Sequence, residues 1–361
     1  MKKIIAFALC ALFAIHSAEA RTIYVNAKRP NNKGSGLSVK KAKKTIQAAI
    51  NIAKKGDKIL VYPGTYAPIK TNNKKIAIKS VKGAKKTKIV AGKKGGYFVR
   101  LGNTKVNGGG KATALTGFLA DGKCKGYRKD GQFWTGVWAG TWKSCTIRHI
   151  NAYAVNGKFV DCVFRDNYRD SSDGDYGFIV CDGTATRCKF LNNEYIVIIS
   201  EVLKNCIISQ NSKMQISTAS LGNCLIADNP RWETVSNSVL INCTMARNSI
   251  SGTTKVPNVC FWNSAFVNCI SWGNYDGLGR LHNVEPDSYY HKSNAYRNCY
   301  AKKADPKFAN AAKGNYRLKK GSPCINKGKL TKAQKKFVGK KDLAGKKRVK
   351  GKAVDIGCYE F

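Results

Sequence analysis

The chain has 361 residues, and its 64 Lys and Arg against 21 Asp and Glu give a formal net charge of +43 at pH 7. This length normally indicates two compact domains, whereas a solenoid, whose units pack only on their neighbours, can extend one core along the whole chain. After the first twenty residues, no apolar run reaches the ~20 residues that span a bilayer, so we expect no transmembrane segment.

The basic charge is concentrated at the two ends of the chain. Residues 21–115 contain 24 basic residues and one acid, residues 301–352 contain 19 and two, and residues 116–300 contain 19 and 15. Such a distribution can attract a polyanion. A Lys-rich surface that only keeps the protein soluble is an equally weighted interpretation of the charge. Nucleic acid is not the expected polyanion, because the chain has no recognition helix or aromatic stacking motif.

The first twenty residues are typical of a secretory signal peptide. Lys2 and Lys3 precede an apolar run over residues 4–15, and Ala18-Glu19-Ala20 is a small-x-small cleavage site. We therefore expect a mature chain that begins near Arg21 and is secreted or held at the cell surface.

A strand over residues 22–26 and a helix over residues 45–53 are predicted next. Ile46, Ala49, Ile50 and Ala53 recur at helical spacing and form one apolar face. This helix can cover the open end of a stack of strands, so we assign residues 21–115 to an N-terminal cap and the first coils.

Residues 116–300 contain an internal repeat of roughly 18 residues with insertions. A cysteine marks each unit: Cys145, Cys162, Cys188, Cys206, Cys224, Cys243, Cys269 and Cys299. Five residues after six of these cysteines an asparagine follows: Asn167, Asn193, Asn211, Asn229, Asn248 and Asn274. Two marks in fixed phase indicate coils that stack in register.

The stretches between these marks are short, apolar or alternating, and bounded by Asn, Gly, Ser and Asp, which is typical of strands joined by turns. We therefore predict an all-β fold, a single-stranded right-handed parallel β-helix. Stacked coils place equivalent residues ~4.8 Å apart, so the cysteines should form an inward ladder and the asparagines should hydrogen-bond along the axis. That spacing exceeds the ~3.8 Å that a disulfide prefers between Cβ atoms, so we expect most thiols to be reduced and buried.

Phrases at both ends resemble a known group of proteins. Residues 45–50 (TIQAAI), 56–57 (GD) and 61–66 (VYPGTY) resemble the opening of secreted β-helix proteins of the pectin-lyase-like superfamily. Residues 304–308 (ADPKF), 321–325 (GSPCI) and 354–360 (VDIGCYE) resemble the close of its choice-of-anchor Q subgroup. The resemblance implies a right-handed parallel β-helix with C-terminal coils and a cap over residues 301–361. The superfamily includes polysaccharide lyases, glycoside hydrolases and proteins without known activity, and no catalytic signature matches residue by residue.

The closing phrases depart from the subgroup at two positions. Cys324 and Cys358 replace residues that are usually small, which suggests a disulfide that fastens the C-terminal cap. Two independent buried thiols are the alternative.

The long repeat intervals predict three insertions, over residues 168–177, 249–258 and 275–290, which all follow the repeated asparagine. Between the first two insertions the coils stay short, which predicts two walls and a floor about 14 to 19 Å long, suited to an extended polymer. The predicted substrate-binding residues are Tyr168 on the first wall and, on the floor, Glu194, Tyr195, Trp232 and Glu233, beside Ser212, Lys213 and Arg231. A Trp next to an Arg can bind a sugar ring and its carboxylate, whereas ordinary turn residues with one half-buried Trp are the alternative.

The first insertion also contains Asp170, Asp173 and Asp175, which could hold Ca²⁺ through carboxylate oxygens. A solvated acidic loop is the favoured alternative, because the spacing does not match an EF-hand.

The sequence therefore predicts a monomeric exported protein that binds an acidic polysaccharide. Whether it also cleaves the polymer by β-elimination stays open at this point, and Lys213 or Arg231 is the candidate base for that reaction. A noncatalytic surface protein that grips anionic envelope polymers through its Lys-rich ends is the alternative. A hydrolase ranks third, because Glu194 and Glu233 lie at different offsets in their coils. His149, His282 and His291 lie in unrelated contexts and are interpreted as surface or core residues.

Overall fold

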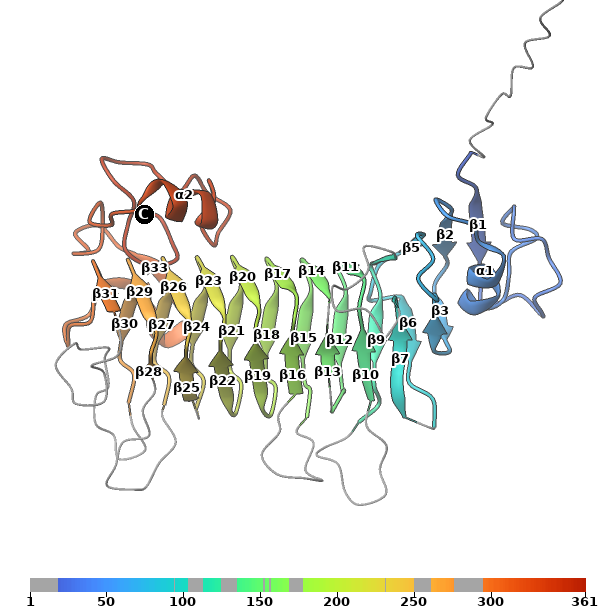
Figure 1. Cartoon of the computed structure of the whole chain (residues 1–361), viewed down its shortest axis with the longest axis horizontal. Helices are drawn as coiled ribbons and strands as arrows, with labels where there is room; N and C mark the ends of the chain where they lie inside the picture. Colours follow the sequence, from blue (N-terminus) through green and yellow to red (C-terminus); the bar gives the residue numbers. More distant parts are fainter. Residues whose placement is uncertain are drawn as a thin grey trace, which may run out of the picture.

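Short strands separated by sharp corners repeat along the chain in the computed structural model (Figure 1). The structure describes residues 19–93, 95–102, 113–124, 135–151, 153–155, 157–168, 178–230, 232–249, 261–275 and 295–361. Their strands form three long parallel sheets that run side by side, and each coil contributes one strand to each sheet in turn. The chain is a right-handed parallel β-helix, as the repeat predicted.

Sheet 1 has twelve strands. They are β1 (Thr22–Val25), β2 (Lys58–Val61), β5 (Ala77–Ser80), β8 (Ala114–Thr116), β11 (Thr141–Lys143), β14 (Lys158–Val160), β17 (Thr184–Thr186), β20 (Val202–Lys204), β23 (Ser220–Gly222), β26 (Val239–Ile241), β29 (Ala265–Val267) and β31 (Ala295–Arg297).

Sheet 2 has ten strands, and sheet 3 has nine. Sheet 2 contains β3 (Gly64–Tyr66), β6 (Thr87–Val90), β9 (Leu119–Asp121), β12 (Thr146–Arg148), β15 (Val163–Arg165), β18 (Lys189–Leu191), β21 (Ile207–Ser209), β24 (Leu225–Ala227), β27 (Thr244–Ala246) and β30 (Ile270–Trp272). Sheet 3 contains β4 (Ile69–Lys70), β7 (Gly96–Arg100), β10 (Thr135–Trp138), β13 (Tyr153–Val155), β16 (Phe178–Cys181), β19 (Ile196–Ile199), β22 (Met214–Ser217), β25 (Trp232–Ser236) and β28 (Phe261–Trp262).

In the regular coils a left-handed backbone residue lies at the corner, and it is usually followed by a buried residue. We call the turns corner 1 (sheet 1 to 2), corner 2 (sheet 2 to 3) and corner 3 (sheet 3 to 1). In the coil that begins at β20, these pairs are Asn205-Cys206, Gln210-Asn211 and Thr218-Ala219, whose first residues have φ between 53° and 58°. Asparagine tolerates this conformation better than most residues, which explains why Asn so often precedes the repeated Cys.

The repeated asparagines form the predicted ladder at corner 2. The Asn193 amide donates to Oδ1 of Asn211 at 2.8 Å, and Asn211 donates to Oδ1 of Asn229 at 3.0 Å. Each Oδ1 also accepts the backbone N–H of the asparagine one coil below, as Asn211 does from Asn193 at 3.1 Å. These fully buried amides are therefore satisfied by one another, which fixes the stacking register.

The repeated cysteines lie at corner 1 as buried or half-buried free thiols, as predicted. The Sγ of Cys206 lies 3.4 Å from the carbonyl oxygens of Ala185 and Lys204, so each thiol has backbone acceptors instead of a disulfide partner. The rings of Phe164 and Phe190, on paired strands, stack at 4.8 Å and continue the core along the axis.

Helix α1 (Ile46–Ile52) lies at the N-terminal end of the stack, as predicted (Figure 1). Thr45 caps it by accepting from the Ala48 amide, and Ile46, Ala49 and Ile50 are buried in the main core. This apolar face packs on the first coils and covers the core at that end of the stack.

The C-terminal region folds back along the side of the helix. It contains an antiparallel pair, β32 (Phe308–Asn310) and β33 (Asn315–Leu318), the short helix η2 (Ala311–Lys313) and helix α2 (Lys332–Val338). Val338 packs on Ile241 and Val267 of sheet 1, while Phe308 and other residues of this region cluster with the outer side of sheet 2. The region therefore covers sheets 1 and 2 near the last coils, on the side away from sheet 3 (Figure 1).

Candidate functional site

Corner 2 is where long and short connections alternate. The connections after β18, β21 and β24 span residues 192–195, 210–213 and 228–231, whereas those after β15 and β27 span 166–177 and 247–260. The insertions therefore enter at one corner with three short coils between them, as the repeat intervals predicted. Most residues of the insertions lie outside the described part of the chain.

A second pair of long and short connections lies beside the first. The connection after β9 spans residues 122–134, and the next, after β12, spans only 149–152. The short connection after β12 therefore lies between the long connections after β9 and β15. We call this place the step, and an acid and a histidine lie there on neighbouring coils.

Asp121 and His149 form a hydrogen-bonded pair at this step. The Nδ1 of His149 lies 2.9 Å from one carboxylate oxygen of Asp121, and Arg148 donates to the other oxygen through Nε at 3.0 Å and Nη2 at 2.9 Å. Burial alone would raise the pKa of Asp121, but hydrogen bonds from the Lys123 amide, Arg148 and His149 outweigh it and hold the pKa below its usual value. Asp121 is thus a fixed anion that orients the imidazole.

This orientation decides which ring nitrogen of His149 can react. A carboxylate that accepts from Nδ1 selects the tautomer whose Nε2 carries the lone pair. The His149 side chain is 27% exposed, so part of the ring is accessible to a ligand. The pair has the arrangement of a general base with its orienting group.

Tyr168 lies beside this pair. Its ring stacks on the His149 ring with centroids 6.2 Å apart and an interplanar angle of 26°. Burial raises the pKa of the Tyr168 hydroxyl, and the nearby carboxylates of Asp166 and Glu194 raise it further. The hydroxyl therefore stays protonated at neutral pH and can donate a proton or a hydrogen bond.

The next two coils bring Tyr195 and Lys213 together. The Nζ of Lys213 lies over the Tyr195 ring, 4.6 Å from its centroid, and Tyr195 is nearly buried. Both residues stand two positions after a ladder asparagine, so their adjacency follows from the predicted register. A cation held on an aromatic face can bind a carboxylate while the ring packs on apolar groups.

The other predicted site residues are only partly described. Glu194 is half-buried and Ser212 exposed, one coil apart at corner 2. Trp232 and Glu233 belong to β25, where the register shifts between Met214 and Gln215 of the paired strand, and their side chains lie outside the described part. The remaining predicted residues, Arg231, Asp170, Asp173 and Asp175, lie outside the described residues altogether.

The outer face of sheet 3 continues from corner 2. One row of paired positions on this sheet runs from Lys70 through Arg100 and Trp138 to Trp262, with Ile199, Ser217 and Ser236 in the coils just before Trp262. Trp262 is 60% exposed, and it was not among the site residues predicted from the sequence. An exposed indole on a flat strand face is a common platform for a sugar ring.

His149 was interpreted from the sequence as a surface or core residue, and the structure shows that this interpretation missed its pairing with Asp121. The signal was hidden because the coil of Asp121 has Phe118 where later coils have the repeated cysteine. Only the register of β9 with β12, which pairs Asp121 with Arg148, places the acid beside the histidine.

Cys324 and Cys358 are free thiols in the structure, where a disulfide was expected. Both are fully buried in the cluster that joins the C-terminal region to sheet 2. Backbone and side-chain hydrogen bonds fasten the region instead, since the Ile356 amide donates to the Cys324 carbonyl and the Cys358 amide to the Thr244 hydroxyl. Burial raises the pKa of each thiol to about 12.

In the described part of the chain, no three acidic, Cys or His side chains converge as metal ligands would. None of the described helices has the length and apolar character required to cross a bilayer.

Known proteins resemble this chain in fold but not in sequence. No family model matches the sequence, and no curated protein matches it. Among solved structures, the pectate lyase Pel9A is 15% identical, with a TM-score of 0.58 over 94% of this chain and 96% of its own. A rhamnogalacturonan lyase is 13% identical, with a TM-score of 0.41 over 88% of this chain and 98% of its own. The likeness to Pel9A supports the parallel β-helix over nearly the full length.

Proposed function

We propose that this protein is exported and binds an acidic polysaccharide along corner 2 and the outer face of sheet 3, and that it cleaves the polymer by β-elimination. The observation that carries the proposal is the Asp121–His149 pair beside Tyr168, on a side that the C-terminal region does not cover in the described structure. We further propose that the chain is a monomer and, on the closing sequence phrases, that it is a member of the choice-of-anchor Q subgroup.

In this proposal His149 is the general base, and it replaces Lys213 and Arg231 in that role. Its Nε2 takes the proton from the carbon that bears the uronate carboxylate, and the electron pair forms a double bond to the neighbouring carbon. The bond from that neighbouring carbon to the glycosidic oxygen breaks, and Tyr168 donates a proton to the leaving oxygen. Asp121 stabilises the imidazolium that forms.

Lys213 serves as a carboxylate-binding residue in the same proposal. It lies three coils from His149, or about 14 Å at the strand spacing, so a polymer and not a single sugar can contact both. Arg231, Trp232 and Glu233 are proposed to extend this binding row, and Asp170, Asp173 and Asp175 to hold Ca²⁺ that neutralises a carboxylate.

The test is the ultraviolet absorbance of the unsaturated uronate product when the purified protein is mixed with a panel of polyuronates and glycosaminoglycans, with and without Ca²⁺. His149→Asn keeps a residue that tolerates the left-handed backbone at φ 52° and should abolish the rise. Gln210→Asn is the matched control at the same corner, and it should retain full activity. A flat trace for the unmodified protein across the panel contradicts cleavage.

The noncatalytic alternative is supported by the charge of the two ends, 24 basic residues against one acid and 19 against two. Under this alternative, charge reversal at exposed terminal lysines such as Lys41 and Lys320 weakens polymer binding. Lys213→Ala and Trp262→Ala would leave binding intact. Under the primary proposal, Lys213→Ala and Trp262→Ala weaken polymer binding, and charge reversal at Lys41 and Lys320 leaves it intact.

A further inference from the structure

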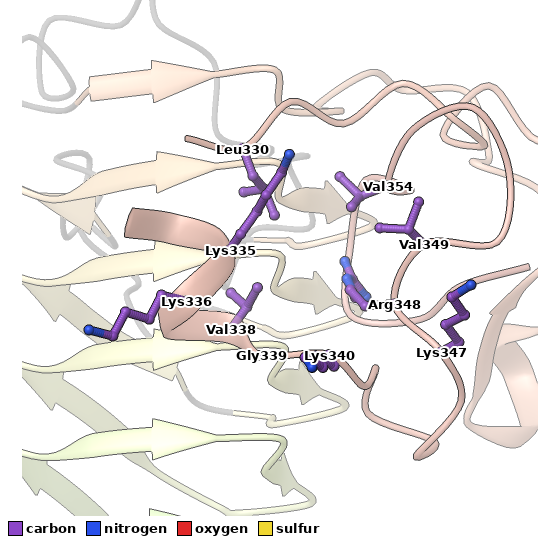
Figure 2. Close-up of a pocket in the computed structure, with 10 residues that line it drawn as sticks. All are labelled: Leu330, Lys335, Lys336, Val338, Gly339, Lys340, Lys347, Arg348, Val349 and Val354. Carbon is purple, nitrogen blue, oxygen red and sulfur yellow. The ribbon is translucent and has the colours of Figure 1, made fainter. Parts of the chain in front are cut away.

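A pocket of about 650 Å³ lies in the C-terminal region, away from corner 2. Helix α2 forms one wall and residues 347–354 form the other (Figure 2). The volume lies within the ~300–1,000 Å³ of small-molecule sites, which are mostly apolar with a few polar groups.

The pocket has an apolar interior. Val338 and Val354 are buried, Leu330 is half-buried, and Val349 remains 40% exposed. An exposed branched side chain on a pocket wall is the kind of surface that an apolar ligand can cover.

The walls are held in place by the surrounding fold. The capping box of Thr331 and Gln334 starts α2, and the bridges Lys341–Lys347 and Gly328–Val354 fix the opposite wall. The pocket is therefore a preformed part of the region.

All charged side chains that line the pocket are cationic. Lys335, Lys336, Lys340 and Lys347 are exposed, although the Lys336 side chain is directed away from the pocket (Figure 2), and none of the described carboxylates lines the pocket. None of these four ammonium groups has an ion pair within the described part of the chain. The opening therefore favours an anionic group over a cationic or neutral one.

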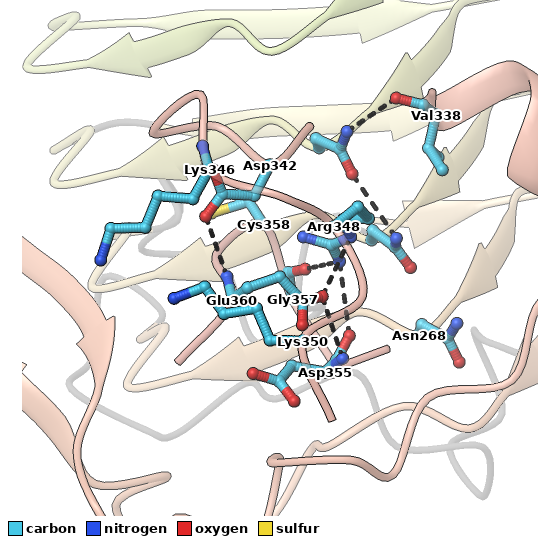
Figure 3. A network of polar contacts seen from close by, with 12 residues as sticks. Asn268, Val338, Asp342, Lys346, Arg348, Lys350, Asp355, Gly357, Cys358 and Glu360 are labelled. Carbon is cyan, nitrogen blue, oxygen red and sulfur yellow. Dashed lines mark hydrogen bonds and ion pairs between the residues drawn. The ribbon is translucent and has the colours of Figure 1, made fainter. Parts of the chain in front are cut away.

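The fifth cation, Arg348, is 2% exposed and lines the pocket. Figure 3 shows the polar contacts that it makes. Its Nε lies 3.3 Å from a carboxylate oxygen of Glu360, and its Nη2 donates to the Gly357 carbonyl at 2.5 Å. Its Nη1 is buried and has no hydrogen-bond acceptor among the described residues.

From the apolar interior, the cationic opening and the absence of a lining carboxylate, we infer that this pocket binds a free aliphatic carboxylate. The chain packs on Val338, Val349 and Val354, and the carboxylate lies among Lys340 and Lys347. This site is independent of the polysaccharide site and does not depend on cleavage.

The experiment is calorimetric titration of the purified protein with decanoate below its micelle concentration. We expect saturable one-to-one binding, with acetate failing because it lacks the chain and decyltrimethylammonium failing because its charge is wrong. The double variant Lys340→Glu/Lys347→Glu and the single variant Val349→Asp should each weaken binding by roughly tenfold or more. Lys320→Glu, an exposed charge reversal outside the pocket, is the matched control and should bind as the unmodified protein does.

Several outcomes overturn the inference. They are no saturable decanoate binding, equal binding of acetate or of the alkylammonium, and an equal loss in Lys320→Glu. Val349→Asp changes an exposed side chain, so it should fold even if the double variant does not, and its circular dichroism should match that of the unmodified protein. If Val349→Asp folds and binds decanoate with unchanged affinity, the pocket is not the site.

Discussion

The Nδ1 of His149 contacts the Asp121 carboxylate at 2.9 Å across two neighbouring coils. The same carboxylate accepts hydrogen bonds from both Nε and Nη2 of Arg148, and the Asp121 side chain is 11% exposed. This network should stabilise the fold as well as orient the imidazole. Unfolding experiments on variants of Asp121 measure the first role, separately from activity.

Asp121→Asn should lower the free energy of unfolding by about 2 kcal/mol at pH 7, because charge-assisted hydrogen bonds to a shielded group are worth ~1.5–3 kcal/mol. The folded pKa of Asp121 lies below its unfolded value, so this contribution is present above the unfolded pKa and is lost as pH falls through the folded pKa. Denaturant unfolding at pH 7 and at acidic pH measures both expectations.

Asp161 provides the control for that prediction. It pairs with Arg187 across two coils at 2.6 Å, but the Asp161 side chain is 45% exposed. Exposed pairs contribute ~0–1 kcal/mol, so Asp161→Asn should have the smaller effect. If Asp121→Asn and Asp161→Asn lose equal amounts of unfolding free energy, the burial of Asp121 does not strengthen its hydrogen bonds.

Glu201 is a buried carboxyl at corner 3, where the equivalent residue one coil below is Gly183. Neither carboxylate oxygen of Glu201 has a hydrogen-bond partner among the described residues. Burial raises the pKa of Glu201 to about 8, with a further contribution from Asp182, although the nearby amides of Gly183 and Val202 oppose the rise. Glu201 is therefore mostly protonated in the folded protein at neutral pH.

Glu201→Gln should stabilise the protein at pH 8–9. Because the folded pKa lies above the unfolded value, the unmodified protein loses stability as pH rises from the unfolded pKa, near 4.5, to the folded pKa, and the glutamine removes that loss. The melting temperatures of the two proteins should converge near pH 4–5. Glu194→Gln, at a half-buried position, is the control, and a pH-independent difference for Glu201→Gln contradicts the assignment.

The asparagine ladder is the third test. Asn211→Ala removes the amide that bonds Asn229 and the oxygen that accepts from Asn193, which leaves buried groups unpaired on both neighbouring coils. We expect a loss of about 2–4 kcal/mol in unfolding free energy, since each orphaned buried group costs ~1–3 kcal/mol. Gln210→Asn, at the adjacent exposed position, should change it by less than about 0.5 kcal/mol.

The same ladder explains how much of the fold the sequence could predict. Corners 1 and 2 use Cys and Asn in fixed phase, so their register was readable without coordinates. Corner 3 accepts Gly183, Glu201, Ala219 and Ser238 in successive coils, and no residue type marks it. The third sheet boundary therefore had to come from the structure.

Some contacts of the candidate site could be predicted from the repeat, and others could not. Tyr195 and Lys213 share an offset from their ladder asparagines, so their contact was predictable from the repeat. The pair of Asp121 and His149 was not predictable, because the coil of Asp121 lacks both marks. The fold-back of the C-terminal region was also hidden, since Asn223 bonds the Val338 carbonyl across a separation that no repeat encodes.

Cys324 and Cys358 give the final prediction. With both thiols buried and their pKa values raised to about 12, neither should react with maleimide in the folded protein, because the thiolate is the nucleophile. Half-buried Cys124 should react faster and serves as the internal control. After unfolding without reductant, peptide mass spectrometry should find both Cys324 and Cys358 labelled. If labelling of these two residues requires prior reduction, a disulfide joins them, and the C-terminal region is fastened covalently as well as by Ile356 and Thr244.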